Sequence, residues 1–165
     1  MKKLDLAAIA VESGCNYPPP FDQPCHGATW RRLGEAGGLT TFGVNLSRLP
    51  PGVWSSQRHW HTREDEFVMV LEGELILVTD SGEEVLRAGD CAAFKAGDPN
   101  GHHLINRSTR DAVVLEIGGR DSEHDDCHYS DIDMVAKAGV RPYLHRTGTP
   151  YPLNEARPWL VGQEP

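Results

Sequence analysis

The 165-residue sequence contains no long apolar run, and no stretch approaches the roughly 18 residues that a membrane-spanning helix needs. Its start, Met1-Lys2-Lys3 before a short apolar stretch, only superficially resembles a secretion signal. Asp5 and Glu12 interrupt the pattern, and no small-residue cleavage site follows. We therefore expect a cytoplasmic protein without a membrane partner.

Basic residues are outnumbered, because 16 Lys and Arg stand against 24 Asp and Glu and give a formal net charge of -8. A surface of this charge repels nucleic acids and anionic membranes at long range. We expect no nucleic-acid partner. A basic pocket remains compatible with binding a small anion.

Cysteine is sparse and irregularly spaced, at Cys15, Cys25, Cys91 and Cys127, with no C-x-x-C pair. This excludes a disulfide framework and a zinc ribbon, and predicts buried thiols. The sequence also lacks a phosphate-binding G-x-x-x-x-G-K-[ST], a G-x-G-x-x-G and a G-x-S-x-G nucleophile motif. Nucleotide-dependent and serine-hydrolase chemistry therefore have no support.

The chain changes character twice along its length. Residues 1–38 are rich in proline and glycine with little apolar periodicity, which predicts an N-terminal arm packed on a core. Residues 39–118 contain short runs of Val, Leu, Ile and Phe separated by turn residues, which predicts a barrel. Residues 119–165 have lower apolar density and form a C-terminal extension. We expect one structural domain overall.

The central region is predicted to be all-β, with turns about every ten residues, as in sandwiches and barrels. Consecutive strands are expected to pair antiparallel. The expected strands are Thr40–Leu49, Trp54–His61, Glu66–Leu71, Glu74–Thr79, Glu83–Arg87, Cys91–Phe94, His102–Asn106 and Ala112–Ile117.

The C-terminal extension gives weaker signals. Residues 121–133 carry many acidic side chains, which predicts a solvated loop without a function. Residues 133–138 are predicted to form a short helix, and residues 143–146 an edge strand before a proline-rich end.

His59-Trp60-His61 lies in a strand-like run, so both imidazoles point to one face and Trp60 to the other. Glu66 begins the next strand, and an antiparallel return would bring it beside them. With a third imidazole from His102, the set would hold three nitrogen donors and one anionic oxygen. Such a set suits divalent transition metals rather than calcium or magnesium.

The spacing of these residues resembles the first motif of the cupin superfamily. The segment Gly52-x6-His59-x-His61-x4-Glu66-x6-Gly73 is similar to G-x5-H-x-H-x3-4-E-x6-G, with one extra residue after the first glycine.

A second segment, Gly89-x5-Lys95-x-Gly97-x4-His102-x3-Asn106, resembles the second cupin motif, G-x5-P-x-G-x2-H-x3-N. Lys95 stands in place of the proline, and two extra residues lengthen the turn before His102.

The resemblance covers residues 40–118. It implies a cupin-type antiparallel β-barrel, also called a double-stranded β-helix or jelly roll, with N- and C-terminal arms. Carried over residue by residue, the family's metal ligands fall on His59, His61, Glu66 and His102. The implied cofactor is one divalent transition metal ion: Zn, Fe, Mn or Ni.

His103 is the alternative to His102 as fourth ligand. Adjacent strand residues face opposite sides, so only one of the two can line the barrel, and the distance to Asn106 favours His102. A register shift in the longer turn would exchange them.

Four protein ligands leave open positions on a six-coordinate ion, which catalysis requires. We expect a metal-dependent enzyme acting on a small oxygen-bearing metabolite, a carboxylate or sugar derivative, by dioxygenase, isomerase or lyase chemistry. The alternative is a non-catalytic small-molecule-binding or sensing module. Periodicity does not place the acid-base candidates Tyr143, His145 and Glu116 in the barrel mouth. A homodimer is expected, since an arm can cover a sheet edge.

Overall fold

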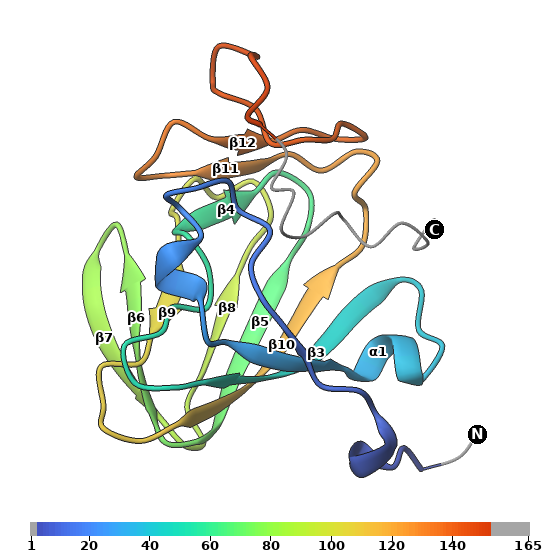
Figure 1. Ribbon diagram of the computed structural model, residues 1–165, viewed down its shortest axis with the longest axis vertical. Helices are drawn as coiled ribbons and strands as arrows, with labels where there is room; N and C mark the ends of the chain where they lie inside the picture. Colours follow the sequence, from blue (N-terminus) through green and yellow to red (C-terminus); the bar gives the residue numbers. More distant parts are fainter. Residues whose placement is uncertain (1–2, 153–165) are drawn as a thin grey trace.

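The computed structural model describes residues 3–152, which are almost entirely β-structure (Figure 1). The strands are β1 (Glu12–Ser13), β2 (Thr29–Arg32), β3 (Phe42–Leu49), β4 (His59–His61), β5 (Glu66–Glu72), β6 (Glu74–Thr79), β7 (Gly82–Arg87), β8 (Cys91–Phe94), β9 (His103–Ile105), β10 (Ala112–Gly119), β11 (Cys127–Tyr129) and β12 (Val135–Ala136). The helical elements are α1 (Leu33–Ala36) and two 3-10 turns, Leu6–Ala8 and Gln23–Cys25. The predicted all-β, jelly-roll class is confirmed.

The strands form one large sheet and two small ones. The six-stranded sheet has the order β1-β2-β3-β10-β5-β8, and the three-stranded sheets have the orders β7-β6-β9 and β12-β11-β4. Between β3 and β10, the hairpin β6–β7 is the one hydrogen-bonded pair of consecutive strands. The expectation of sequential pairing is therefore wrong for most of the barrel.

Gly73 explains part of this difference. Its φ of 78° is in the left-handed region, and an added Cβ would lie 2.8 Å from the carbonyl oxygen of Asp111. The turn sends the chain from β5 in the large sheet to β6 in the opposite sheet instead of folding it back. A turn residue in the sequence therefore predicts where the chain changes direction, but it does not predict which strand the following strand pairs with.

The core lies between the large sheet and the β7-β6-β9 sheet. Val68 and Val70 alternate with less buried residues on β5, and Leu75 and Leu77 do so on β6. The two sets pack into one buried cluster with Leu104 of β9. Period-two alternation thus fixes which strand faces point inward, and Glu66 begins β5 on the same inward face as Val68.

Both flanking segments extend the sheets. In the N-terminal arm, β2 pairs antiparallel with β3 and β1 adds the edge strand of the large sheet, and in the C-terminal extension β11 pairs with β4. The helix predicted for residues 133–138 is wrong, because Val135–Ala136 forms β12. The edge strand expected at residues 143–146 is reduced to bridges of Leu144 with Val135 and Pro150.

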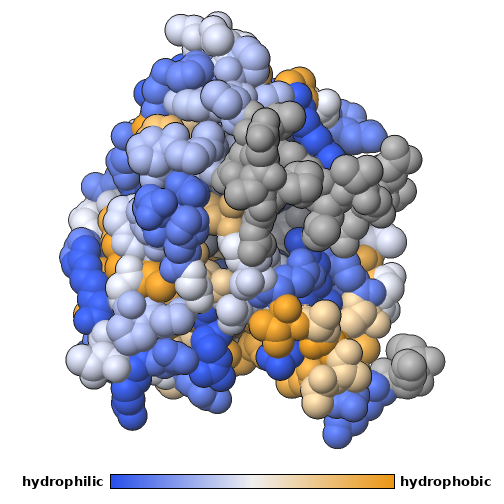
Figure 2. All heavy atoms as spheres, in the orientation of Figure 1, coloured by the Kyte–Doolittle hydropathy of each residue, from blue (hydrophilic) through white to orange (hydrophobic). Residues whose placement is uncertain are grey.

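Apolar side chains gather at the lower right of the visible face, around α1 and the N-terminal 3-10 turn (Figure 2). The exposed large apolar residues of these parts of the chain are Leu6, Val11, Leu39 and Phe42. Exposed apolar patches are frequent at protein interfaces, and the homodimer stays a prediction. Among residues 3–152, no helix has the length and apolarity to cross a membrane.

Candidate metal centre

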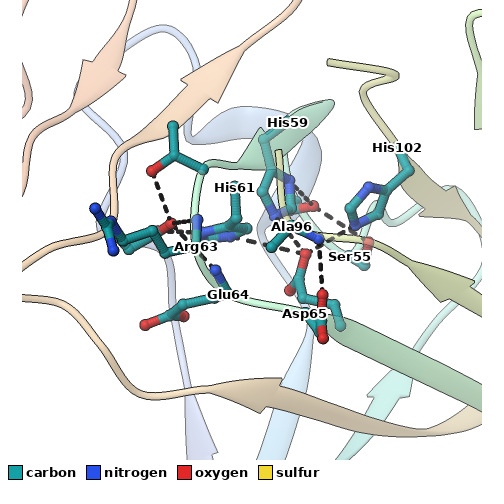
Figure 3. Close-up of polar contacts among 12 residues, drawn as sticks. Ser55, His59, His61, Arg63, Glu64, Asp65, Ala96 and His102 are labelled. Carbon is teal, nitrogen blue, oxygen red and sulfur yellow. Dashed lines mark hydrogen bonds and ion pairs between the residues drawn. The ribbon is translucent and has the colours of Figure 1, made fainter. Parts of the chain in front are cut away.

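Three imidazoles converge on one carboxylate oxygen. Glu66 Oε2 lies 3.0 Å from His102 Nε2, 3.6 Å from His59 Nε2 and 3.7 Å from His61 Nε2. His59 and His61 project together from β4 toward His102 (Figure 3). The structure therefore brings together all four residues that the sequence indicates.

Local structure accounts for this convergence. Alternation along β4 puts His59 and His61 on one face, while His102 reaches them through an antiparallel bridge between His59 and His102 just before β9. Glu66 arrives from the large sheet, not from a strand paired with β4. The four side chains meet because β4, with His102 bridged to it, faces the beginning of β5 in the large sheet.

Hydrogen bonds orient two of the imidazoles. His59 Nδ1 lies 2.9 Å from the Gln57 carbonyl oxygen, and His61 Nδ1 lies 2.5 Å from Asp125 Oδ2. Both partners are acceptors, so each Nδ1 carries the proton and each Nε2 directs a lone pair at the site. Phe94 stacks on the His102 ring, with ring centroids 3.5 Å apart.

The residues fit a divalent metal ion. Glu66 Oε2 is buried and has no hydrogen-bond partner, although three imidazole nitrogens surround it. Burial lowers the pKa of His59 to about 4, which leaves the imidazole neutral as a ligand must be. Burial alone would raise the pKa of Glu66, but His102 and His59 outweigh it and lower that pKa to about 2. An ion at this point would satisfy the buried oxygen and the nitrogens together.

Asp125 is the functional neighbour that the sequence did not reveal. It falls in the acidic stretch predicted to be a solvated loop, and that part of the prediction is wrong, because Asp125 is buried and Cys127–Tyr129 forms β11. Asp125 is buried and bonds His61, while its Oδ1 accepts from the Arg63 backbone N–H at 2.7 Å and from the Thr62 hydroxyl at 3.2 Å. It is therefore a carboxylate that holds a candidate metal ligand in place.

Two further groups lie close to the histidines. The ligand atoms of His59, His61 and Cys127 lie within 4.8 Å of one another, and so do those of His61, Glu64 and Asp125. Burial lowers the pKa of His61, but Cys127, Glu66 and Asp125 more than compensate and raise it to about 10. These surroundings favour a positive charge at His61, which a bound divalent cation would supply in place of a second ring proton. Cys127 carries no motif signal, because only the pairing of β11 with β4 brings it here.

His103 takes a different position from His102. Its Nδ1 donates to the Ser56 carbonyl oxygen at 3.0 Å, and its ring packs edge-on against Trp54 with centroids 4.6 Å apart. His102, and not His103, contacts Glu66. The longer turn does not exchange the two residues.

A cavity of about 380 Å³ opens beside the four candidate ligands. Its remaining polar wall includes Arg32, Glu35, Asn45, Ser55, Ser56, Glu64, Glu116 and Arg120. A volume of this size suits a metabolite-sized ligand. Many hydrogen-bonding groups in a single wall favour a ligand with several oxygen atoms.

Glu116 is a further, half-buried carboxyl in the wall of this cavity. The Ser47 hydroxyl donates to its Oε2 at 2.5 Å. Burial and the nearby charge of Glu66 raise the pKa of Glu116 to about 7, although the hydrogen bond from Ser47 lowers it. Of the acid-base candidates that periodicity left unplaced, Glu116 lines the cavity, whereas His145 bonds Asp133 instead.

Two glycines lie in the sheet beside Glu66. In the large sheet, Gly118 pairs with Glu66 on one side and with Gly43 on the other, and all three line the cavity. A Cβ at Gly118 would lie 3.7 Å from Glu66 Cγ, at ordinary contact distance, whereas a Cβ at Gly43 would lie 3.3 Å from Arg120 Nε. The Arg120 side chain therefore covers Gly43, and Gly118 presents backbone next to Glu66.

Comparison with known proteins agrees with this architecture. The family model described as "Cupin domain" matches residues 45–118. A crystal structure described as a sugar phosphate isomerase from a cupin superfamily, from Silicibacter pomeroyi, is 46% identical, covers 92% of this chain and 97% of its own, and superposes with a TM-score of 0.86.

Two further proteins are more distant. A Mycobacterium tuberculosis protein named as a beta-D-galactosidase is 35% identical over 100 residues, which is 59% of this chain and 83% of that protein. A polyketide cyclase from Streptomyces resistomycificus shares the fold, with 19% identity, a TM-score of 0.58, and coverage of 72% of this chain and 79% of its own. The two motifs, the facing sheets and these similarities together establish that the chain belongs to the cupin superfamily.

Proposed function

We propose that this cupin is a metal-dependent enzyme that isomerises a small sugar, with His59, His61, Glu66 and His102 as the metal ligands. The observation that carries the proposal is that the four ligands and the half-buried carboxyl of Glu116 share one polar cavity. Among dioxygenase, isomerase and lyase chemistry, similarity to the protein described as a sugar phosphate isomerase favours isomerisation.

The ion would be Zn, Fe, Mn or Ni. All of these accept imidazole nitrogen and carboxylate oxygen, and occupancy in the cell follows metal supply as well as affinity. A bound divalent ion would polarise a carbonyl or hydroxyl oxygen of the sugar and so acidify the neighbouring C–H and O–H groups.

Glu116 would transfer the proton between carbons. Interconversion of an aldose and a ketose moves one hydrogen from the hydroxyl-bearing carbon to the carbonyl carbon, and a second from the hydroxyl to the carbonyl oxygen, with no net gain or loss. A carboxyl whose pKa is raised to about 7 can accept and return a proton near neutral pH. Asn45 and Ser55 would hold the remaining hydroxyls.

The test uses protein loaded separately with each metal and a panel of aldoses, ketoses and their phosphates. Incubation in deuterium oxide, followed by NMR, should show product isomer and solvent deuterium at the carbon that gains the proton. Glu116→Gln should retain the metal but lose at least about 100-fold in turnover, and His102→Ala should lose the metal. Metal binding without turnover of any sugar would favour the non-catalytic binding or sensing module.

A second candidate is hydrolysis of a galactoside. Four carboxyl groups, Glu35, Glu64, Glu66 and Glu116, line one cavity, and paired carboxyl groups carry out most glycoside hydrolysis. The similar Mycobacterium tuberculosis protein is named for this activity. Release of nitrophenol from nitrophenyl galactoside, lost in Glu116→Gln, would favour this function over isomerisation.

A further inference from the structure

A second chamber of about 280 Å³ adjoins the cavity beside the candidate metal. The two spaces share Tyr17, Arg32, Asn45, Ser55 and Glu116 in their walls. A ligand long enough to occupy both spaces would pass Glu116.

The floor of this chamber follows directly from strand register. Arg32 of β2 pairs with Asn45 of β3, which pairs with Glu116 of β10, so three polar side chains form one row. In the next row Trp30 pairs with Ser47. Of these two rows, the one nearer the metal contributes three polar side chains to the chamber, and the other adds an indole ring.

The remaining wall comes from the flanking segments of the chain. Cys15 and Asn16 of the N-terminal arm line the chamber together with Tyr143 of the C-terminal extension. Tyr17 connects the two segments, since its ring centroid lies 5.6 Å from that of Tyr143 and 5.4 Å from that of Tyr129. The chamber is thus built largely by residues outside the matched family segment 45–118.

We infer that the second chamber binds a second sugar ring, so that the substrate is a reducing disaccharide whose reducing end lies at the metal. This inference rests on the proposed function for the first ring. A pyranose ring has hydroxyls around its edge and C–H groups on its faces, and sites for it combine hydrogen-bonding side chains with aromatic rings. The Arg32–Asn45 row supplies the first kind of contact, and Trp30 with Tyr143 supplies the second.

The experiment measures equilibrium binding to the metal-loaded protein by calorimetry, with glucose, lactose and maltose as probes. Both disaccharides have glucose at the reducing end, so any gain over glucose comes from the second ring. We expect at least one of them to bind about tenfold more tightly than glucose. Trp30→Leu, which keeps an apolar side chain, should abolish that gain and leave the affinity for glucose unchanged.

Trp54→Leu is the matched control, because Trp54 packs against His103 and lines neither space. Trp30→Phe provides a second variant that keeps an aromatic ring, and it should retain most of the gain. Circular dichroism and metal content verify that each variant is folded and loaded.

Equal binding of glucose and both disaccharides, or an equal loss of affinity for all three in Trp30→Leu, would overturn the inference. Absence of binding by every probe would do the same. A binding gain that depends on Trp30, without any isomerised product, would refute the isomerase function and support the second-ring site. Turnover of glucose with no gain in binding for a disaccharide would support the isomerase function and refute the second-ring site.

Discussion

Replacement of Asp125 by Asn should weaken metal binding although Asp125 is not a candidate ligand. One carboxylate oxygen accepts from His61 Nδ1 at 2.5 Å, and the other accepts from the Arg63 backbone N–H at 2.7 Å. An Asn amide has only one oxygen. If that oxygen serves Arg63, the NH₂ group meets the Nδ1–H of His61, and the imidazole must turn or move its proton to the nitrogen that faces the metal.

The expected loss of metal affinity is about 10- to 100-fold, the range found when groups behind metal ligands are changed. This corresponds to roughly 1.4 to 2.8 kcal/mol of binding free energy. Competition with a fluorescent zinc chelator measures it. Asp126→Asn is the neighbouring control, because Asp126 bonds Lys137 at 2.6 Å and the Ala138 amide at 2.8 Å.

Zinc binding by Asp125→Asn as tight as that of wild type would contradict the role of Asp125 behind His61. A loss of affinity in Asp126→Asn as large as that in Asp125→Asn would also contradict it, since a general charge effect would then explain both. Thermal unfolding with excess chelator separates the two readings further. We expect the Asp125→Asn defect to be larger with metal present than without it, because the change acts through His61.

Three further predictions concern the core, the half-buried carboxyl and the glycine beside Glu66. Leu75→Ala should lower the free energy of unfolding, measured by urea titration, by about 2 to 5 kcal/mol, because Leu75 is 0% exposed. Leu71→Ala is the control: Leu71 is 41% exposed, and its replacement should change the free energy of unfolding by less than about 0.5 kcal/mol. In the folded protein the Glu116 carboxyl has a pKa of about 7, above its ordinary 4.5. It therefore stabilises the fold at low pH and loses that contribution as the pH rises through 7. Relative to Glu116→Gln, the free energy of unfolding of wild type should fall by up to about 3 kcal/mol between pH 4.5 and 8. Gly118→Ala should fold and bind zinc normally but bind sugars several-fold more weakly, and unchanged sugar affinity in calorimetry would show that sugars do not contact Gly118.

Much of the barrel could be predicted because its signals are local. Alternation along Glu74–Thr79 and Cys91–Phe94 gave strands with the same bounds as the structure. The expected strand Trp54–His61 was too long, since only His59–His61 belongs to β4. Strand partners were harder to predict, because a pairing such as β5 with β10 joins segments far apart in sequence and leaves no periodic trace.

The candidate ligands could also be predicted, because His59, His61 and Glu66 are close in sequence and their spacing is characteristic. Asp125 and Cys127 could not. They follow His61 by more than sixty positions and reach it only through the pairing of β11 with β4. Within an acidic stretch the sequence does not show which aspartate is buried, and only the tertiary structure distinguishes Asp125 from its solvated neighbours.

The contact between His61 and Asp125 joins the C-terminal extension to the candidate metal centre. Residues 119–146 are attached to the barrel partly through the same imidazole that faces the candidate ion. Docking of the extension and capture of the ion are therefore reciprocal: each strengthens the other by the same free energy. Chelation should speed amide hydrogen exchange in β11 and β12 before it affects β5 or β10. Proteases should then find their first cleavage sites there, so that metal supply would set the lifetime of the protein.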